Sequence, residues 1–536
     1  MALLAPHRSI AQSTLPLLLP DANALPQATF RFRQLTSFTR WDELLGNGGT
    51  RDFGSLLAID SLTVTEVPQF RPTEDDIRVA SGVSNFRLDA GRIASVADSR
   101  IASAPLIIEY GVTNRLTLGL VVPLVFTRTT TFSQLNPTPG LANVGPNPVR
   151  TGSEAAAVQN NTVVRTMRDA QMLLTQKFNA CQMTPTGEGC SALLAQATAV
   201  QALVQNSEVL ANTLENLYGT STSLKPGQQF VPLDNSPVQR AIASRIAELA
   251  TEFKNFLGTD VVSGRVVGAG GPGANFELQN LFRSVGRDSL TSTTRTSLGD
   301  ISLGATLQLL NSFTGPRDSS RGVRYRLAVN GTFRIGTGQP ANRNQLFDIG
   351  TGYGQEGIEG GAAADLALGT RLYLTAVGSY TAQLGTRHVL RVPSAGNVPY
   401  PLAPPFLGEF SAGNVLQLSV IPRYRLARYL SLNAQYALVR TGADKYTLGA
   451  PVESEEFLIP AEDGPPVPPF GYAASTAHQI GVGFSYSTVA TRDRAPGVLP
   501  FEVTFSHLET IAGSGGPLFK TFRDQIELRV YWKTKK

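Results

Sequence analysis

The chain has 536 residues, of which 42% are hydrophobic and only 16% are charged, whereas soluble domains carry about 25% charged residues. It contains no run of about 18 to 20 uninterrupted apolar residues, which argues against a helical membrane protein. Its formal charge of +5 comes from arginines scattered along the chain rather than from one basic face, so we expect no nucleic-acid partner. The 51 glycines, 26 phenylalanines and 14 tyrosines indicate instead a β-protein with much lipid-facing surface.

The N-terminal residues 1–26 begin with MALLAPHRSIAQS, a short apolar run that is followed by small residues. This pattern fits the end of a signal peptide, but it lacks the basic start and the long apolar core of a complete one. We interpret residues 1–26 as an export or N-terminal segment and infer export from the rest of the chain.

Residues 27–132 are predicted to form the first strands of the fold. In LTLGLVVPLVF, the even-numbered positions from Leu116 to Phe126 are all apolar, whereas Arg115 and Thr117 fall on the opposite face. A period of two is typical of a strand and not of a helix. The preceding residues 112–114 then form a tight turn after an earlier strand. The stretch 60–100 is ambiguous, and it supplies either none or two further strands.

Residues 133–296 change to a helical period and are predicted to form a small inserted α-helical domain. Its apolar stripes cover residues 163–178, 193–217 and 238–256. The third stripe is opened by a Ser-Pro pair and closed by Gly258, which are typical start and stop signals of a helix. These stripes are expected to form the core of the domain itself, and the alternative is a surface that binds another surface protein.

The two cysteines, Cys181 and Cys190, lie in CQMTPTGEGC, where a proline and two glycines allow a small loop to close. We predict a disulfide, which suits an oxidising compartment such as the periplasm or the cell surface. The alternatives are two free thiols or half of a metal site. No other cysteine and no histidine lies nearby, so we expect no metal.

Residues 297–536 are predicted to supply the remaining strands. In VRYRLAVNGTFRI, apolar residues such as Tyr325 and Phe333 alternate with arginines and other polar residues. Because lipid provides no partner for backbone N–H and C=O groups, a sheet with an apolar outer face and a polar inner face must close on itself. We therefore predict an all-β transmembrane antiparallel β-barrel of about 12 strands, or about 14 if 60–100 contributes two. The predicted strands lie near 27–38, 101–111, 115–130, 297–311, 323–336, 357–368, 371–383, 414–425, 429–441, 477–488, 500–511 and 520–533.

The links between these strands alternate between short and long, as in bacterial outer-membrane barrels with short periplasmic turns and long external loops. An even number of strands then places both termini on the periplasmic side and residues 133–296 outside the cell.

The inner face is predicted to carry charged side chains. They form either an ion-pair network that stiffens the wall or a constriction that selects polar or anionic solutes. The candidate lumen-lining residues are Arg324, Arg326, Arg334, Arg423, Arg425, Arg529, Asp300, Glu359, Asp365, Glu502 and Glu527.

Two short patches resemble a known group of proteins. The hairpin YGVTNRL leads to an apolar strand with an internal proline, and LGDISLG follows later in the chain. The matching residues are Tyr110, Gly111, Thr113, Arg115, Leu116, Pro123, Gly299, Asp300, Leu303 and Gly304. In these patches the chain resembles outer-membrane transporter-like proteins associated with the meta-pathway of phenol degradation. The resemblance implies passage of small, often aromatic or hydrophobic, compounds across the outer membrane.

We therefore expect an outer-membrane channel or transporter for small solutes, with outer-membrane lipid and the solute as partners and no cofactor. The alternative is a structural or adhesive surface protein that uses the barrel as an anchor for residues 133–296. We do not expect an enzyme, because the nearest catalytic pattern, Ser506 with His507 and Glu509, places neighbouring strand residues on opposite faces.

Overall fold

The structure of the chain is a computed structural model. The structure describes residues 22–46, 49–58, 60–65, 67, 70–135, 142–221, 228–270, 292–313, 322–342, 348–391, 405–427, 429–451, 474–489, 500–516 and 518–533. The predicted N-terminal segment 1–26 lies outside these ranges except for its last five residues, 22–26.

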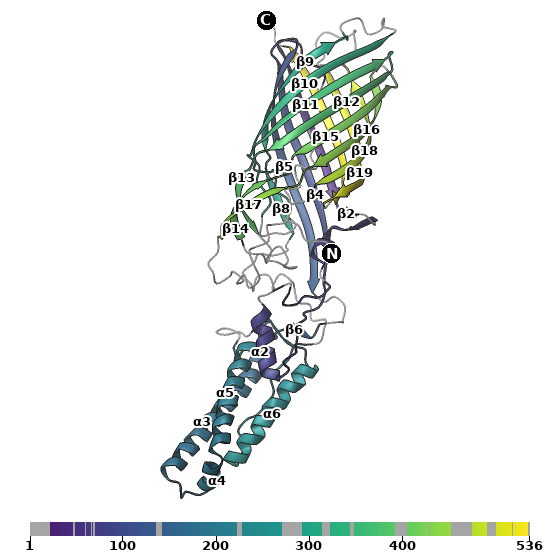
Figure 1. The fold of residues 1–536 in the computed structure, drawn as a ribbon. Helices are drawn as coiled ribbons and strands as arrows, with labels where there is room; N and C mark the ends of the chain where they lie inside the picture. Colours follow the sequence, from purple (N-terminus) through teal and green to yellow (C-terminus); the bar gives the residue numbers. More distant parts are fainter. Residues whose placement is uncertain are drawn as a thin grey trace.

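Within these ranges, twelve long strands form a closed antiparallel β-barrel, which confirms the predicted fold class (Figure 1). The strands are β1 (Thr29–Trp41), β4 (Ile93–Gly111), β5 (Leu116–Leu135), β9 (Ile301–Asn311), β10 (Val323–Ile335), β11 (Gly357–Leu368), β12 (Leu372–Gln383), β15 (Val415–Arg425), β16 (Leu430–Thr441), β18 (Ser475–Ser487), β19 (Phe501–Gly515) and β21 (Phe522–Lys533). The barrel closes because β1 pairs with β21 on one side and with β4 on the other. The short strand β8 (Thr293–Leu298) continues the line of β9 along β5.

Side chains alternate between the two faces of this wall as the period of two predicts. Leu118, Phe126 and Val482 are exposed on the exterior, whereas Thr117 and Thr127 are buried on the interior. The exterior therefore offers an apolar surface to lipid. Closure of the barrel pairs the backbone N–H and C=O groups of the edge strands, for which lipid has no hydrogen-bond partners. The result is a transmembrane wall of the kind found in bacterial outer membranes.

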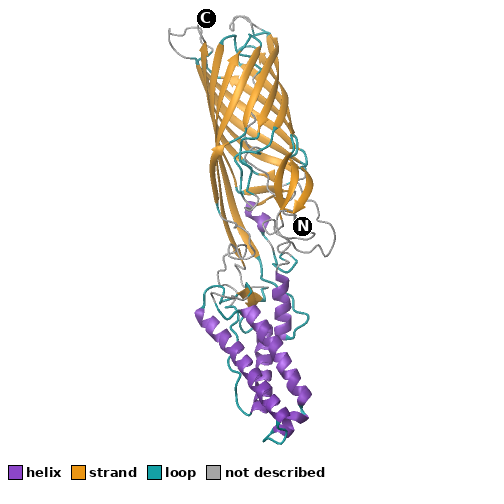
Figure 2. Ribbon diagram, turned by 90° about the vertical axis from the view of Figure 1, so that its left-hand side faces the viewer, coloured by secondary structure: helices purple, strands orange, loops and turns teal. Residues whose placement is uncertain are grey.

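A helical domain lies beyond the barrel end that carries the long links (Figure 2). Its helices are α2 (Arg71–Ser81), α3 (Glu154–Met183), α4 (Cys190–Ala195), α5 (Ala197–Tyr218) and α6 (Pro237–Leu257). Ser236 caps α6 by accepting a hydrogen bond from the N–H of Gln239, and Gly258 ends it with a φ of 80°. Cys181 and Cys190 form the predicted disulfide, which joins the end of α3 to the start of α4.

The ambiguous stretch 60–100 forms α2 and the beginning of β4 rather than two extra strands, so the alternative of 14 strands is wrong. A proline in the first turn and Gly82, at a φ of 73°, define the ends of this short helix. Its Ile77 is fully buried in the same apolar core as Leu214 of α5 and Ile246 of α6. The helical domain is therefore built from two barrel links, β1–β4 and β5–β8, and not from one insertion alone.

The remaining described elements are short and lie in links at the barrel end that faces the helical domain. They are β2 (Glu43–Gly46), β3 (Gly49–Asp52) and β20 (Leu518–Phe519) in one sheet, β6 (Val144–Pro146) with β7 (Phe230–Pro232), β13 (Thr386–Arg391) with β14 (Pro405–Ser411) and β17 (Lys445–Pro451), and the 3₁₀ helix η1 (Phe53–Leu57). No helix in the described part of the chain is both long and apolar enough to cross a membrane.

Candidate functional site in the barrel lumen

The barrel encloses a cavity of about 250 Å³, and one of its walls is apolar. This apolar wall consists of Leu35 on β1, Pro105 and Ile107 on β4, and Val121 and Pro123 on β5. Two of its pairs are direct cross-strand neighbours, because Pro105 lies opposite Pro123 and Ile107 lies opposite Val121. The five side chains therefore form one continuous patch on adjacent strands, where an aqueous pore would carry polar groups.

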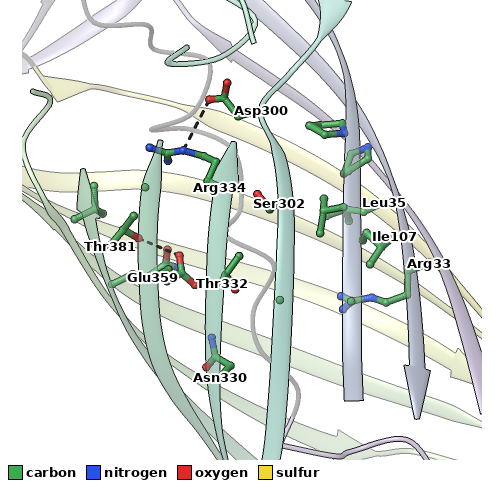
Figure 3. A pocket seen from close by; sticks show the side chains of 18 of the residues that line it. Arg33, Leu35, Ile107, Asp300, Ser302, Asn330, Thr332, Arg334, Glu359 and Thr381 are labelled. Atoms are coloured by element: carbon green, nitrogen blue, oxygen red, sulfur yellow. Dashed lines mark hydrogen bonds and ion pairs between the residues drawn. The ribbon is translucent and has the colours of Figure 1, made fainter. Parts of the chain in front are cut away.

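The wall across the cavity is largely polar, although Val415 and Val439 also line it (Figure 3). It carries Asn330 and Thr332 on β10, Glu359 on β11, Thr381 on β12 and Gln417 on β15. Glu359 accepts a hydrogen bond of 3.0 Å from the hydroxyl of Thr381, so its carboxylate is held against the wall. A solute in this cavity thus meets an apolar surface on one side and hydrogen-bonding groups on the other.

Toward the short turns, six inner-face charges form one network in which the signs alternate. In order they are Arg31, Glu109, Arg33, Glu527, Arg529 and Glu502. Arg31 holds Glu109 through two hydrogen bonds of 2.5 and 2.8 Å. Glu527 accepts from Arg33 at 2.7 Å and from Arg529 at 2.8 Å. Among the described residues, the three positive and three negative charges of this network cancel, which favours the interpretation of these residues as a network that stiffens the wall.

The predicted lumen-lining residues fall into separate groups. Asp300, Arg334 and Glu359 line the cavity, and Arg529, Glu502 and Glu527 belong to the network above. The others lie away from the cavity. Arg326 pairs with Asp365 at 2.7 Å. Two arginines, Arg324 and Arg326, lie over the ring of Phe313, and two more, Arg423 and Arg425, lie over the ring of Tyr373. The structure therefore does not bring all of them together into one constriction.

Asp300 does not offer a free carboxylate to the lumen, because backbone groups of the β10–β11 link surround it. Its Oδ1 accepts hydrogen bonds from the N–H of Gly338 at 2.7 Å and of Gly354 at 3.3 Å, and its Oδ2 accepts from Tyr353 at 2.8 Å. Arg334 adds an ion pair of 3.9 Å. Asp300 thus holds the described parts of this link, 336–342 and 348–356, over the lumen, where Tyr353 lines the cavity.

The described N-terminal residues also lie inside the barrel, near the short turns. Ala22 is fully buried against inner-face residues of β11 and β12, and its carbonyl accepts a hydrogen bond of 2.8 Å from Gln308. The N–H of Leu25 donates to the hydroxyl of Thr117 at 2.8 Å. Asn23 lines the cavity. Residues 22–25 therefore narrow this end of the lumen.

Several site residues were missed from the sequence. Arg31 and Arg33 alternate with two phenylalanines in FRFRQL, so the period of two already placed them on the inner face. Glu109 carries a similar signal, since it follows Ile107 at the same spacing in β4. Arg523 also lines the cavity, but it lies at the beginning of β21, where the alternating pattern starts.

Groups with catalytic potential do not converge in the described part of the chain. Ser506 donates to Gln525 on the inner face, whereas His507 contacts Asp524 at 2.7 Å on the exposed outer face. Among the described residues, no group of three His, Cys, Asp or Glu side chains is arranged to hold a metal ion.

Comparison with protein-family models and with curated proteins gave no match. Among solved structures, the chain is similar to an outer membrane channel from Pseudomonas putida F1, with 10% identity, a TM-score of 0.40, and coverage of 96% of this chain and 100% of that one. It is also similar to the Pseudomonas putida toluene transporter TodX, with 11% identity, a TM-score of 0.25, and coverage of 96% and 91%. A third similarity is to the transport unit of the autotransporter AIDA-I from Escherichia coli, with 7% identity, a TM-score of 0.32, and coverage of 97% of both chains.

Proposed function

We propose that the protein is an outer-membrane channel that admits a small, largely apolar solute through its barrel lumen. The observation that carries this proposal is the apolar wall of Leu35, Pro105, Ile107, Val121 and Pro123 inside the cavity. Apolar side chains gain nothing from facing a water-filled pore, but they gain free energy when an apolar solute covers them. Within the described ranges, the lumenal arginines near the short turns are each paired with a carboxylate, so this network does not favour selection of ions.

The resemblance of YGVTNRL and LGDISLG to outer-membrane proteins associated with phenol degradation extends the proposal to aromatic solutes. A cavity of about 250 Å³ lies slightly below the usual range of small-molecule pockets, which suits a compound of one or two rings.

Uptake of radiolabelled naphthalene, a two-ring compound, by intact cells tests the proposal, because an intact outer membrane slows the entry of such apolar aromatic compounds. We expect faster entry in cells that make the protein than in cells without it. Ile107→Asp places a charge in the apolar wall and should slow entry, whereas Thr332→Asp, on the polar wall, is the matched control. Equal entry with and without the protein, for comparable amounts in the membrane, would instead favour the barrel as an anchor for the helical domain.

We also propose an orientation in which the short turns face the periplasm and the helical domain lies outside the cell. The alternation of short and long links supports this orientation. A membrane-impermeant protease added to intact cells should then cleave within the helical domain. Cleavage that requires disruption of the outer membrane would contradict the orientation without affecting the lumen.

A further inference from the structure

One arginine in the cavity has no counter-charge among the described residues. Arg523 lies on the inner face of β21, is 4% exposed and lines the cavity. The other three arginines of the cavity lining, Arg31, Arg33 and Arg334, each lie within 4 Å of a carboxylate. In the described part of the chain, Arg523 has no such neighbour, and its Nε has no hydrogen-bond partner.

A second donor without a partner lies on the same inner face. The hydroxyl of Ser103 on β4 is buried, lines the cavity and makes no hydrogen bond within the described ranges. Strand β1 relates the two residues, because Ser37 is the cross-strand partner of Ser103 and Thr39 is the partner of Arg523. An unpaired buried charge is far more costly than a paired one, so a site with two unused donors favours an anionic hydrogen-bond acceptor.

These donors lie beside the apolar wall, toward the long links. Arg523 lies opposite Thr39 on β1, and Leu35 precedes Thr39 by four residues. The backbone of Arg523 is therefore displaced from Leu35 by about 14 Å along the strand direction. Arg523 and Leu35 nevertheless line the same cavity, so one solute can contact both. A ligand that uses both features must therefore have an apolar body and an anionic group at one end.

We propose that the lumen binds small amphipathic monocarboxylates, with the carboxylate on Arg523 and Ser103 and the apolar body on the wall formed by Leu35, Pro105 and Ile107. This inference rests on the proposed channel function and narrows its substrate class. Arg523 supplies a charge-assisted hydrogen bond that an uncharged solute of the same shape cannot match.

Calorimetric titration of the purified, refolded full chain with phenylacetate and with its uncharged counterpart 2-phenylethanol tests the inference. We expect Arg523→Gln to weaken phenylacetate binding by about tenfold to a hundredfold and to leave 2-phenylethanol binding unchanged. Arg523→Lys should restore part of the affinity because it restores the charge. Arg326→Gln is the control, since this inner-face arginine pairs with Asp365 away from the cavity.

Three results would overturn the inference. If Arg523→Gln binds phenylacetate as tightly as the wild type, the carboxylate does not use this residue. If both ligands lose affinity equally, the substitution acts on the cavity as a whole and not on the charge. In these two cases the proposed channel function stands, because 2-phenylethanol still binds to the wild type. If the wild-type protein binds neither compound, both the inference and the aromatic form of the proposed function fail.

Discussion

Asp300→Asn should release the β10–β11 link from the lumen without unfolding the barrel. The side chain of Asp300 is fully buried and accepts three backbone hydrogen bonds, from Gly338, Tyr353 and Gly354. Hydrogen bonds to a charged group contribute about 1.5–3 kcal/mol each, but they are not additive and asparagine keeps one acceptor. Breaking a buried charge pair costs about 3–5 kcal/mol, and we expect a loss of this size for the folded link because Arg334 also loses its counter-charge.

The loss can be measured through Thr351→Cys, which introduces a thiol at a fully buried position of the link. In the double variant with Asp300→Asn, a thiol reagent should label this cysteine at least about 100-fold faster than in Thr351→Cys alone, since 1.4 kcal/mol corresponds to a factor of ten. Asp365→Asn provides the matched control, because Asp365 pairs with Arg326 and Thr375 but holds no link. The control also carries Thr351→Cys. Equal labelling rates in the single variant and in both double variants would refute the idea that Asp300 holds the β10–β11 link in place.

Three further predictions concern the network and the helical domain. Glu527→Gln removes the carboxylate that joins two arginines and should lower the free energy of unfolding in liposomes by about 3–5 kcal/mol, measured in urea. Reducing the disulfide of Cys181 and Cys190, which closes a loop with a sequence separation of 9, should destabilise only the helical domain, by about 2–3 kcal/mol in thermal unfolding followed by circular dichroism. Burial raises the pKa of Tyr218, so the folded domain keeps this proton while the unfolded chain loses it above about pH 10. Stability should therefore fall as the pH rises above about 10, and Tyr218→Phe should remove this dependence at a cost of about 0.5–1.5 kcal/mol at neutral pH through loss of the hydrogen bond to Gln239.

The barrel could be predicted from the sequence because every strand must meet the same physical requirement, an apolar outer face and a polar inner face. A residue such as Leu118 or Val482 must face lipid, and its neighbours must not, so the period of two is strong in every strand. The helices of the domain were predicted for a similar reason, since their buried stripes and end signals are local. In both cases residues fewer than about 20 apart carry the whole pattern.

Other features depend on contacts between distant residues, and these were not predicted. The 11 residues of α2 gain their stability from a core that they share with α5 and α6, more than 100 residues later. Asp300 binds the N–H groups of Gly338 and Tyr353, which lie 38 and 53 residues later in the chain. No local sequence pattern indicates these contacts. The position of Ala22 inside the lumen likewise depends on Gln308.

The division of charge along the lumen supports an amphipathic rather than a purely apolar solute. Near the short turns, the described charges of the network from Arg31 to Glu502 are equal in number and opposite in sign, so together they neither attract nor repel an anion. Nearer the long links, Arg523 stands without a described counter-charge beside an apolar wall. A purely apolar solute would leave this guanidinium desolvated and unpaired, which is the costlier arrangement. A solute that brings its own carboxylate removes that cost while its body still covers Leu35 and Ile107.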